Sequence, residues 1–512
     1  MPAVKDIHQA GTTRIATIAP LHSEKLIPHV MPRILTSWDM TTTFIVSTYL
    51  ASCASTVAAG GPAAITYLVL VGLTFFVPCL IATAQLGHVY PHEGALYNWA
   101  HHTIGGYWSF FAGFCAWFPG VLISSSLASL LVIYATPFLY PTLLNQPWKQ
   151  GIAICLVLAV SGFLSTFRFR LVKNLVNLLV ILLFSGTLVI ALACIIWLIR
   201  GHHSATTFTN WSDWEPRSDN IVMFGLLAFA YLGTEGPLTM AGEIKGRKVI
   251  GRHLIWGPLL LALIYALNTL SVLIVLGRQA AYDPFALVRT VYVVLGKDFA
   301  VATSVCLMAS FLATILVYNY LYARLLLVAS VDKRLPRYIS KLNRRQVPVN
   351  AILLQALLAI IVTLAMFNLA PLLTMIGQPQ TFSAQVYMVS QASAALVWTI
   401  SAAFLFICLI GCILKQSQAF QRHRIFPIPL LWFSIVIGIL SCAITVADTL
   451  LYSWTNLIPN TQWWYLVGGV TSVLLALSAF ISIFAKSEVD WQTLNAYIAV
   501  PLQKENASRI ER

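Results

Sequence analysis

The chain has 512 residues, of which 59% are hydrophobic and only 9% are charged. A water-soluble domain carries about 25% charged residues, so this composition excludes a soluble globular enzyme. The formal net charge is +14, because 31 Lys and Arg residues outnumber 17 Asp and Glu residues. Since the basic residues lie in short connections beside apolar segments, the charge does not indicate a nucleic-acid partner.

Long segments without Asp, Glu, Lys or Arg follow one another along the chain. A transmembrane helix needs about 20 mostly apolar residues, and turn residues divide the longest segments into two helices each. This pattern predicts an all-α integral membrane protein with twelve transmembrane helices. Their centres are expected near residues 46, 75, 120, 157, 187, 230, 265, 312, 360, 398, 437 and 474.

The basic residues also predict the orientation of these spans. Most Lys and Arg residues fall on the cytoplasmic side when the N-terminus is placed there, as the positive-inside rule requires. Both termini are therefore predicted to be cytoplasmic, with polar tails at 1–33 and 486–512 and the last two spans within 425–485. We expect the protein in a cell membrane, plasma or inner, with membrane lipid as its surroundings.

Span 6 is predicted to be interrupted. Residues 229–237 read Phe-Ala-Tyr-Leu-Gly-Thr-Glu-Gly-Pro, and two glycines, a proline and an acid within five residues do not continue a helix in lipid. The unpaired backbone groups must then face protein or a water-filled cavity. Each exposed half-helix end carries about half an elementary charge, which suits a zwitterionic ligand.

Span 1 carries a weaker signal for an interruption. Residues 49–56 read Tyr-Leu-Ala-Ser-Cys-Ala-Ser-Thr, without a central glycine or proline, and Gly-Gly-Pro follows at 60–62. Ser and Thr can support an unwound turn by bonding to nearby backbone. The alternative interpretation is a small-residue face that packs against another helix.

Glu235 is the main acid predicted near the middle of a span, where burial of a carboxylate is costly. One interpretation is a site for a cationic substrate or a proton, and the other is a carboxylate that bonds to the amides of the interrupted helix. The histidines fall at span ends or loops without a cluster of Cys or acidic residues, so neither a metal nor another cofactor is expected.

Four stretches of the sequence resemble the amino acid–polyamine–organocation superfamily, the amino acid permeases. They are the Gly-Gly-Pro-Ala-Ala run at 60–64, the pattern at 84–105, residues 229–235 with 243–245, and the segments within 322–351. The last contains Tyr-Ala-Arg, Asp-Lys-Arg-Leu-Pro and Val-Pro-Val-Asn-Ala in the family's order.

The resemblance implies a LeuT-like fold, with an inverted repeat of five plus five spans at 34–199 and 219–415 and two peripheral helices. It implies a secondary active transporter rather than an enzyme, which moves amino acids or related amines by alternating access. The substrate would lie between interrupted spans 1 and 6, with Phe229 as an aromatic gate. The implied substrate-binding residues are Ala51, Ser52, Cys53, Ser55, Phe229, Ala230, Tyr231, Leu232 and Gly233.

The sequence also departs from the family pattern. The glycine-rich G-x-G-I-F of span 1 is absent, and Gln85 stands where the family has Glu. Some proton-coupled members carry a lysine inside span 5, whereas residues 174–199 contain no charged residue. This favours exchange. The alternatives are a proton-coupled symporter in which Glu235 takes part, and an amino acid sensor that binds without transport.

Overall fold

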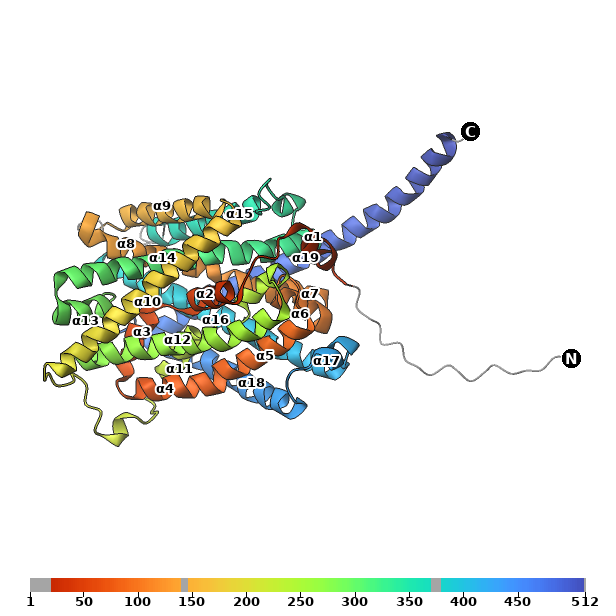
Figure 1. Ribbon diagram of the computed structural model, residues 1–512. Coiled ribbons are helices and arrows are strands. Elements are labelled where there is room, and N and C mark those ends of the chain that lie inside the picture. Colours follow the sequence, from red (N-terminus) through yellow and green to blue (C-terminus); the bar gives the residue numbers. More distant parts are fainter. Residues whose placement is uncertain (1–19, 140–145, 370–378, 511–512) are drawn as a thin grey trace.

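The computed structural model describes residues 20–139, 146–369 and 379–510. The N-terminal tail up to residue 19 and the last two residues of the predicted C-terminal tail lie outside these ranges. The protein is 81% helix and no strand occurs in the described residues, which confirms the predicted all-α fold. Figure 1 shows the helices packed side by side in one elongated bundle.

The helices of the first part of the chain precede residue 200. In order they are α1 (His22–Val30), α2 (Ser37–Thr48), α3 (Ala51–Thr56), η1 (Val57–Gly60), α4 (Ala63–Val71), η2 (Gly72–Phe76), α5 (Val77–Val89), α6 (Leu96–Ile104), α7 (Gly106–Trp117), α8 (Pro119–Leu139), α9 (Pro147–Ser165) and α10 (Phe169–Ile199).

The second part of the chain contains the longest helices. In order they are η4 (Trp211–Asp213), α11 (Val222–Ala230), η5 (Gly236–Glu243), α12 (Arg247–Val275), η6 (Arg278–Tyr282), α13 (Ala286–Leu295), α14 (Lys297–Val331), η7 (Arg337–Ser340), α15 (Val349–Leu364), η8 (Ala365–Leu369), α16 (Pro379–Lys415), α17 (Gln418–His423), α18 (Ile428–Leu451) and α19 (Asn460–Ile510).

Ten helices in the described part of the chain are long and apolar enough to cross a membrane, and an eleventh span results when the bent pair Ser37–Thr48 and Ala51–Gly60 is counted as one. The predicted span near residue 230 falls on α11 and η5, which have nine and eight residues. Since neither piece reaches membrane length alone, the number twelve remains a prediction.

The outer helices turn apolar side chains away from the protein. On α10, for example, Leu171, Leu178, Ile181, Leu188 and Ile195 are each more than half exposed. A continuous exposed patch of this kind marks an interaction surface in a water-soluble protein, and in a bilayer it contacts the lipid chains. The protein is therefore a multi-pass integral membrane protein.

One end of the bundle, called here the inner side, carries α1 and the end of α19 (Figure 1). Helix α1 is fixed there by hydrogen bonds from the Ser23 backbone N–H and hydroxyl to Asp332, both at 2.8 Å. The Glu24 carboxylate also accepts bonds at 2.6 Å from His102 and Asn98 of α6. The predicted cytoplasmic location of this side, and the boundaries of the two repeats, remain predictions.

Candidate substrate site

Span 1 is interrupted at Tyr49 and Leu50. Both residues have extended backbone conformations, with φ and ψ of −75° and 123° at Tyr49 and of −122° and 109° at Leu50. The helical segments on the two sides, Ser37–Thr48 and Ala51–Gly60, are bent by 56° relative to each other. Span 1 is thus a broken helix even though the family glycines are absent.

The predicted binding residues of span 1 lie in the first turns of the second half-helix, directly after the interruption. The Ser55 hydroxyl donates to the Ser52 carbonyl at 2.9 Å, so this hydroxyl is used within the helix. The Ser52 hydroxyl instead accepts a bond from Tyr387 of α16. The four residues are Ala51, Ser52, Cys53 and Ser55.

Helix α12 supplies the hydrogen bonds that the interruption removes from the backbone. The Tyr265 hydroxyl accepts a bond from the Leu50 N–H at 2.9 Å and donates to the Thr48 carbonyl at 3.3 Å. Asn268, one turn further along α12, donates from its amide nitrogen to the Tyr49 hydroxyl at 2.7 Å. Because a buried backbone group without a partner is costly, these side chains stabilise the extended conformation.

Helix α14 supports the end of α2 from another direction. The Thr314 hydroxyl donates to the Val46 carbonyl at 3.0 Å, and the Tyr318 hydroxyl donates to the Ser47 carbonyl at 2.8 Å. The last carbonyls of any helix lack partners within the helix. Hydrogen bonds from side chains of α12 and α14 therefore stabilise a backbone conformation that glycine would adopt at little energetic cost.

Span 6 is interrupted over residues 231–235, between α11 and η5. Gly233 lies at the centre with φ of 95°, a left-handed conformation that favours glycine. A Cβ atom built there would meet no atom closer than the Thr48 hydroxyl oxygen at 4.0 Å, so the conformation rather than the space requires glycine. The next residue, Thr234, exchanges a hydrogen bond of 2.9 Å with Thr83 of α5.

The two interruptions lie next to each other. The Tyr265 ring contacts both the Tyr49 and the Tyr231 ring, with centroid distances of 5.1 and 6.1 Å. The Thr48 hydroxyl, close to Gly233, is buried and has no hydrogen-bond partner among the described residues. A buried hydroxyl without a partner is unusual, and it is available here to a bound molecule.

Glu235 ends the interruption of span 6 and is 7% exposed. Its two carboxylate oxygens accept bonds from the hydroxyls of Thr234 and Ser401, each at 3.4 Å. Within the described part of the chain, no basic side chain forms an ion pair with it. Both interpretations of this acid, as a proton or cation site and as a structural carboxylate, therefore remain predictions.

A cavity of about 20 Å³ lies beside these residues, lined among others by Leu232, Gly233, Glu235, Tyr322 and Trp398. A space of that size holds about one water molecule. An amino acid is much larger, so the surrounding side chains must move apart before one can enter.

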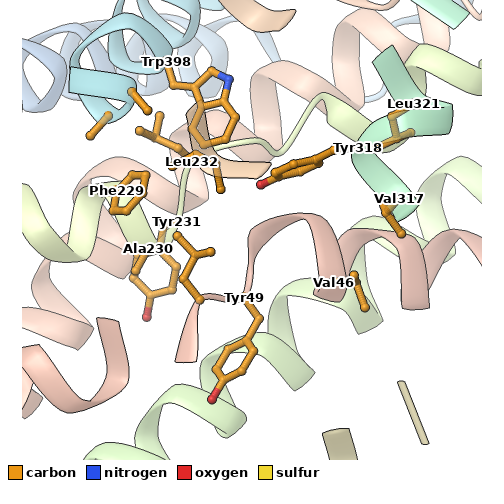
Figure 2. Close-up of a cluster of buried hydrophobic side chains, with 14 of the residues drawn as sticks. Val46, Tyr49, Phe229, Ala230, Tyr231, Leu232, Val317, Tyr318, Leu321 and Trp398 are labelled. Atoms are coloured by element: carbon orange, nitrogen blue, oxygen red, sulfur yellow. The ribbon is translucent and has the colours of Figure 1, made fainter. Parts of the chain in front are cut away.

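Aromatic side chains surround the interruptions (Figure 2). Phe229, in the last turn of α11, lies 6.3 Å from the Trp398 ring and 5.4 Å from the Trp454 ring. Tyr318 lies 6.0 Å from Trp398 on another side. These side chains give the region uncharged walls, and the predicted gate function of Phe229 remains a prediction.

Ion pairs close the bundle between this region and the inner side. Arg324 of α14 donates to Glu243 of η5 at 2.8 Å, and both side chains are almost completely buried. Lys173 of α10 pairs with Asp39 of α2 at 2.9 Å.

On the outer side, the contact is between neutral groups. The Tyr387 hydroxyl that donates to Ser52 also accepts a bond from the Gln391 amide at 2.6 Å.

Sequence reasoning overlooked the side chains that hold the broken helices, chiefly Tyr265, Tyr318 and Tyr387. A signal was present for Tyr265 and Tyr318, because both lie well inside an apolar segment rather than at a membrane interface, whereas Tyr387 lies near the start of its span. Tyrosines of interfacial belts lie near span ends, whereas a buried tyrosine hydroxyl needs a partner. Tyrosines in the interior of a span therefore indicate backbone or side-chain groups that need hydrogen bonds.

Comparison with known proteins assigns this sequence to a family. The family model described as "Amino acid permease" matches residues 35–431, which is most of the chain. Mouse solute carrier family 7 member 13 is 26% identical over 368 residues, covering 70% of this chain and 71% of its own.

Two bacterial transporters are also similar. An uncharacterised transporter of Legionella pneumophila is 22% identical over 306 residues, covering 57% of this chain and 64% of its own, slightly less than two thirds. The inner membrane transporter YjeM of Escherichia coli is 32% identical over 92 residues, covering 17% of this chain and 18% of its own.

Two solved transporter structures share the fold, both at 14% sequence identity. MhsT in complex with L-phenylalanine has a TM-score of 0.54, covering 82% of this chain and 99% of its own. The manganese transporter of Eremococcus coleocola, bound to an aromatic bis-isothiourea compound, has a TM-score of 0.56, covering 89% of this chain and 94% of its own.

The predicted resemblance is therefore confirmed by a match over most of the chain and by a shared transporter fold. The chain belongs to the amino acid permease family, within the amino acid–polyamine–organocation superfamily, and is a multi-pass integral membrane protein with a LeuT-like fold.

Proposed function

We propose that this protein exchanges neutral amino acids by alternating access, with the substrate held between the interruptions of spans 1 and 6. The observation that carries this proposal is the contact between the two interruptions, with the partnerless Thr48 hydroxyl facing Gly233. A substrate can supply the missing hydrogen-bond partner.

The ends of the half-helices support a zwitterionic substrate. The start of α3 carries partial positive charge and the end of α11 carries partial negative charge. We assign the substrate carboxylate to the backbone near Ala51, Ser52 and Cys53. The amino group is assigned to the region of the carbonyls at residues 229–233.

The choice of a neutral substrate rests on the surrounding walls. Phe229, Tyr318 and Trp398 are uncharged, and Glu235 is the acid that lines the cavity. A substrate side chain with a carboxylate would face Glu235 without a neighbouring cation to offset the repulsion.

The choice of exchange rests on span 5. Residues 174–199 carry no charge, and Lys173 lies in the second turn of α10 with Asp39 as its partner. Proton-coupled symport is the second candidate, because Glu235 is buried without a cationic partner among the described residues. An amino acid sensor with this fold is the third.

The test uses proteoliposomes that contain the purified protein. Uptake of each labelled neutral amino acid is measured with and without unlabelled amino acid inside, and with and without a proton or sodium gradient. An exchanger needs the internal amino acid and ignores both gradients. Uptake driven by one gradient alone contradicts exchange, and binding without uptake indicates a sensor.

The location of the site is tested separately with Thr48→Val. This change removes the partnerless hydroxyl and should weaken substrate affinity by about tenfold, which corresponds to about 1.4 kcal/mol. Thr187→Val is the matched control, because Thr187 of α10 also has a buried hydroxyl without a partner among the described residues. Equal effects of the two changes would contradict the proposed site.

A further inference from the structure

A second and larger cavity lies on the inner side, apart from the two interruptions. Its volume is about 330 Å³. Five arginines line it, and they come from three different parts of the chain. They are Arg168 just before α10, Arg170 in the first turn of α10, Arg324 of α14, and Arg344 and Arg345 between η7 and α15.

The charge in this cavity is not balanced by acids. Glu243 also lines it, but this carboxylate already pairs with Arg324 at 2.8 Å. The other four arginine side chains are exposed, and none of them has an ion pair with any acid in residues 20–139, 146–369 or 379–510. Several unpaired positive charges that line one cavity favour an anion between them.

Arg324 adds a buried donor to the cavity. It is 1% exposed, its guanidinium stacks over the Phe169 ring at 4.5 Å, and its Nε donates to Glu243. Its Nη1 has no hydrogen-bond partner among the described residues. A buried guanidinium nitrogen without a partner is costly, and a bound anion would satisfy it.

The loop before α15 that carries Arg344 and Arg345 is held in a turn by the Asn343 side chain. The Asn343 side-chain oxygen accepts bonds from the N–H groups of Arg345 at 2.9 Å and Val347 at 3.0 Å. Gln346 has a left-handed conformation with φ of 59°. Arg344 and Arg345 lie in this turn and both line the cavity.

We propose that this cavity binds a phosphate-bearing anion at the inner face of the membrane. The planar guanidinium group matches the oxygens of a phosphate with two parallel hydrogen bonds. Basic pockets between spans on the cytoplasmic side are suited to anionic headgroups. A soluble phosphate or pyrophosphate offers the same chemistry, so the experiment distinguishes the two sources.

The test measures the thermal unfolding midpoint of the purified full-length protein in nanodiscs. Neutral-lipid nanodiscs receive sodium pyrophosphate or phosphate, compared with sodium chloride at equal ionic strength. A second set of nanodiscs contains phosphatidylglycerol or a phosphoinositide without added phosphate. Stabilisation in the first set identifies a soluble ligand, and stabilisation in the second set alone identifies a lipid headgroup.

The variant Arg344→Gln with Arg345→Gln should weaken the apparent affinity for the stabilising probe by at least about tenfold. Its matched control is Arg337→Gln with Lys341→Gln, because both residues are exposed in the same connection but do not line the cavity. This control removes the same charge and should bind like the unmodified protein.

The single change Arg168→Gln should weaken binding from the other connection. No stabilisation by any of these probes, or equal loss of affinity in the two double variants, would overturn the proposal.

Discussion

The substitution Tyr265→Phe tests whether side chains of α12 hold the interruption of span 1. The removed hydroxyl bridges the Leu50 N–H at 2.9 Å and the Thr48 carbonyl at 3.3 Å. Tyr265 is 1% exposed, so water does not readily replace the lost oxygen. The ring itself stays, and with it the contacts to Tyr49 and Tyr231.

The expected cost follows from the two backbone groups left behind. A buried donor without a partner costs about 1 to 3 kcal/mol, and the carbonyl, whose bond is longer, adds less. We therefore expect the free energy of unfolding to fall by about 2 kcal/mol. For a chain of this size, that loss lowers the unfolding midpoint by roughly 2 °C.

The assay is tryptophan fluorescence during heating of the protein in detergent, with Tyr134→Phe as the control. The Tyr134 hydroxyl donates one bond of 2.6 Å to the Pro284 carbonyl. Its removal therefore leaves one carbonyl without a donor, but no N–H group loses its acceptor. A midpoint for Tyr265→Phe that falls no further than that of Tyr134→Phe would refute the role assigned to this hydroxyl.

Three further changes address the acids of the protein. Glu235→Gln should preserve substrate binding and flatten the pH dependence of transport if the carboxylate carries a proton; an unchanged pH profile in proteoliposomes speaks against that role. Asp332 lies just beyond α14, and burial raises its pKa from 3.8 to about 6. Between about pH 4 and 6, the folded protein therefore retains a proton that the unfolded chain releases. The free energy of unfolding thus falls as the pH rises through this window. Asp332→Asn should remove this pH dependence, as measured by unfolding midpoints at several pH values. Glu243→Gln leaves Arg324 without its buried counter-ion and should cost about 3 kcal/mol, seen as a lower midpoint than that of Asp283→Gln, whose partner Arg289 is exposed.

The interruption of span 6 could be predicted from sequence because its cause is local. Gly233 adopts a conformation that other residues rarely take, and Gly236 with Pro237 begins the next helical segment. Gly257 with Pro258 lies inside the continuous α12, so a single such pair does not mark a break. The signal in span 6 is the cluster of two glycines, a proline and an acid within five residues. The membrane fold could likewise be predicted from the apolar segments, because a chain that crosses lipid must pair its backbone groups within long apolar helices.

The interruption of span 1 could not be located in this way because its cause is not local. Its extended residues, Tyr49 and Leu50, have no special backbone preference, and the hydrogen bonds that hold them come from Tyr265 and Asn268 of α12. These side chains are more than 200 positions away along the chain. The hydroxyl-rich run after the break proved to be helical, since Ser55 and Thr56 bond to the Ser52 carbonyl.

The contacts that close the two sides of the bundle differ in kind, and this difference bears on transport. On the outer side, Tyr387 and Ser52 are neutral groups that water can solvate when they separate. On the inner side, separation of Glu243 from Arg324 exposes two buried charges, which is costly unless each gains a new partner. The inner opening is therefore expected to be the slower step. An anion in the arginine-lined cavity would give Arg324 a second counter-ion, so that occupancy of that cavity lowers the cost of this step and speeds exchange.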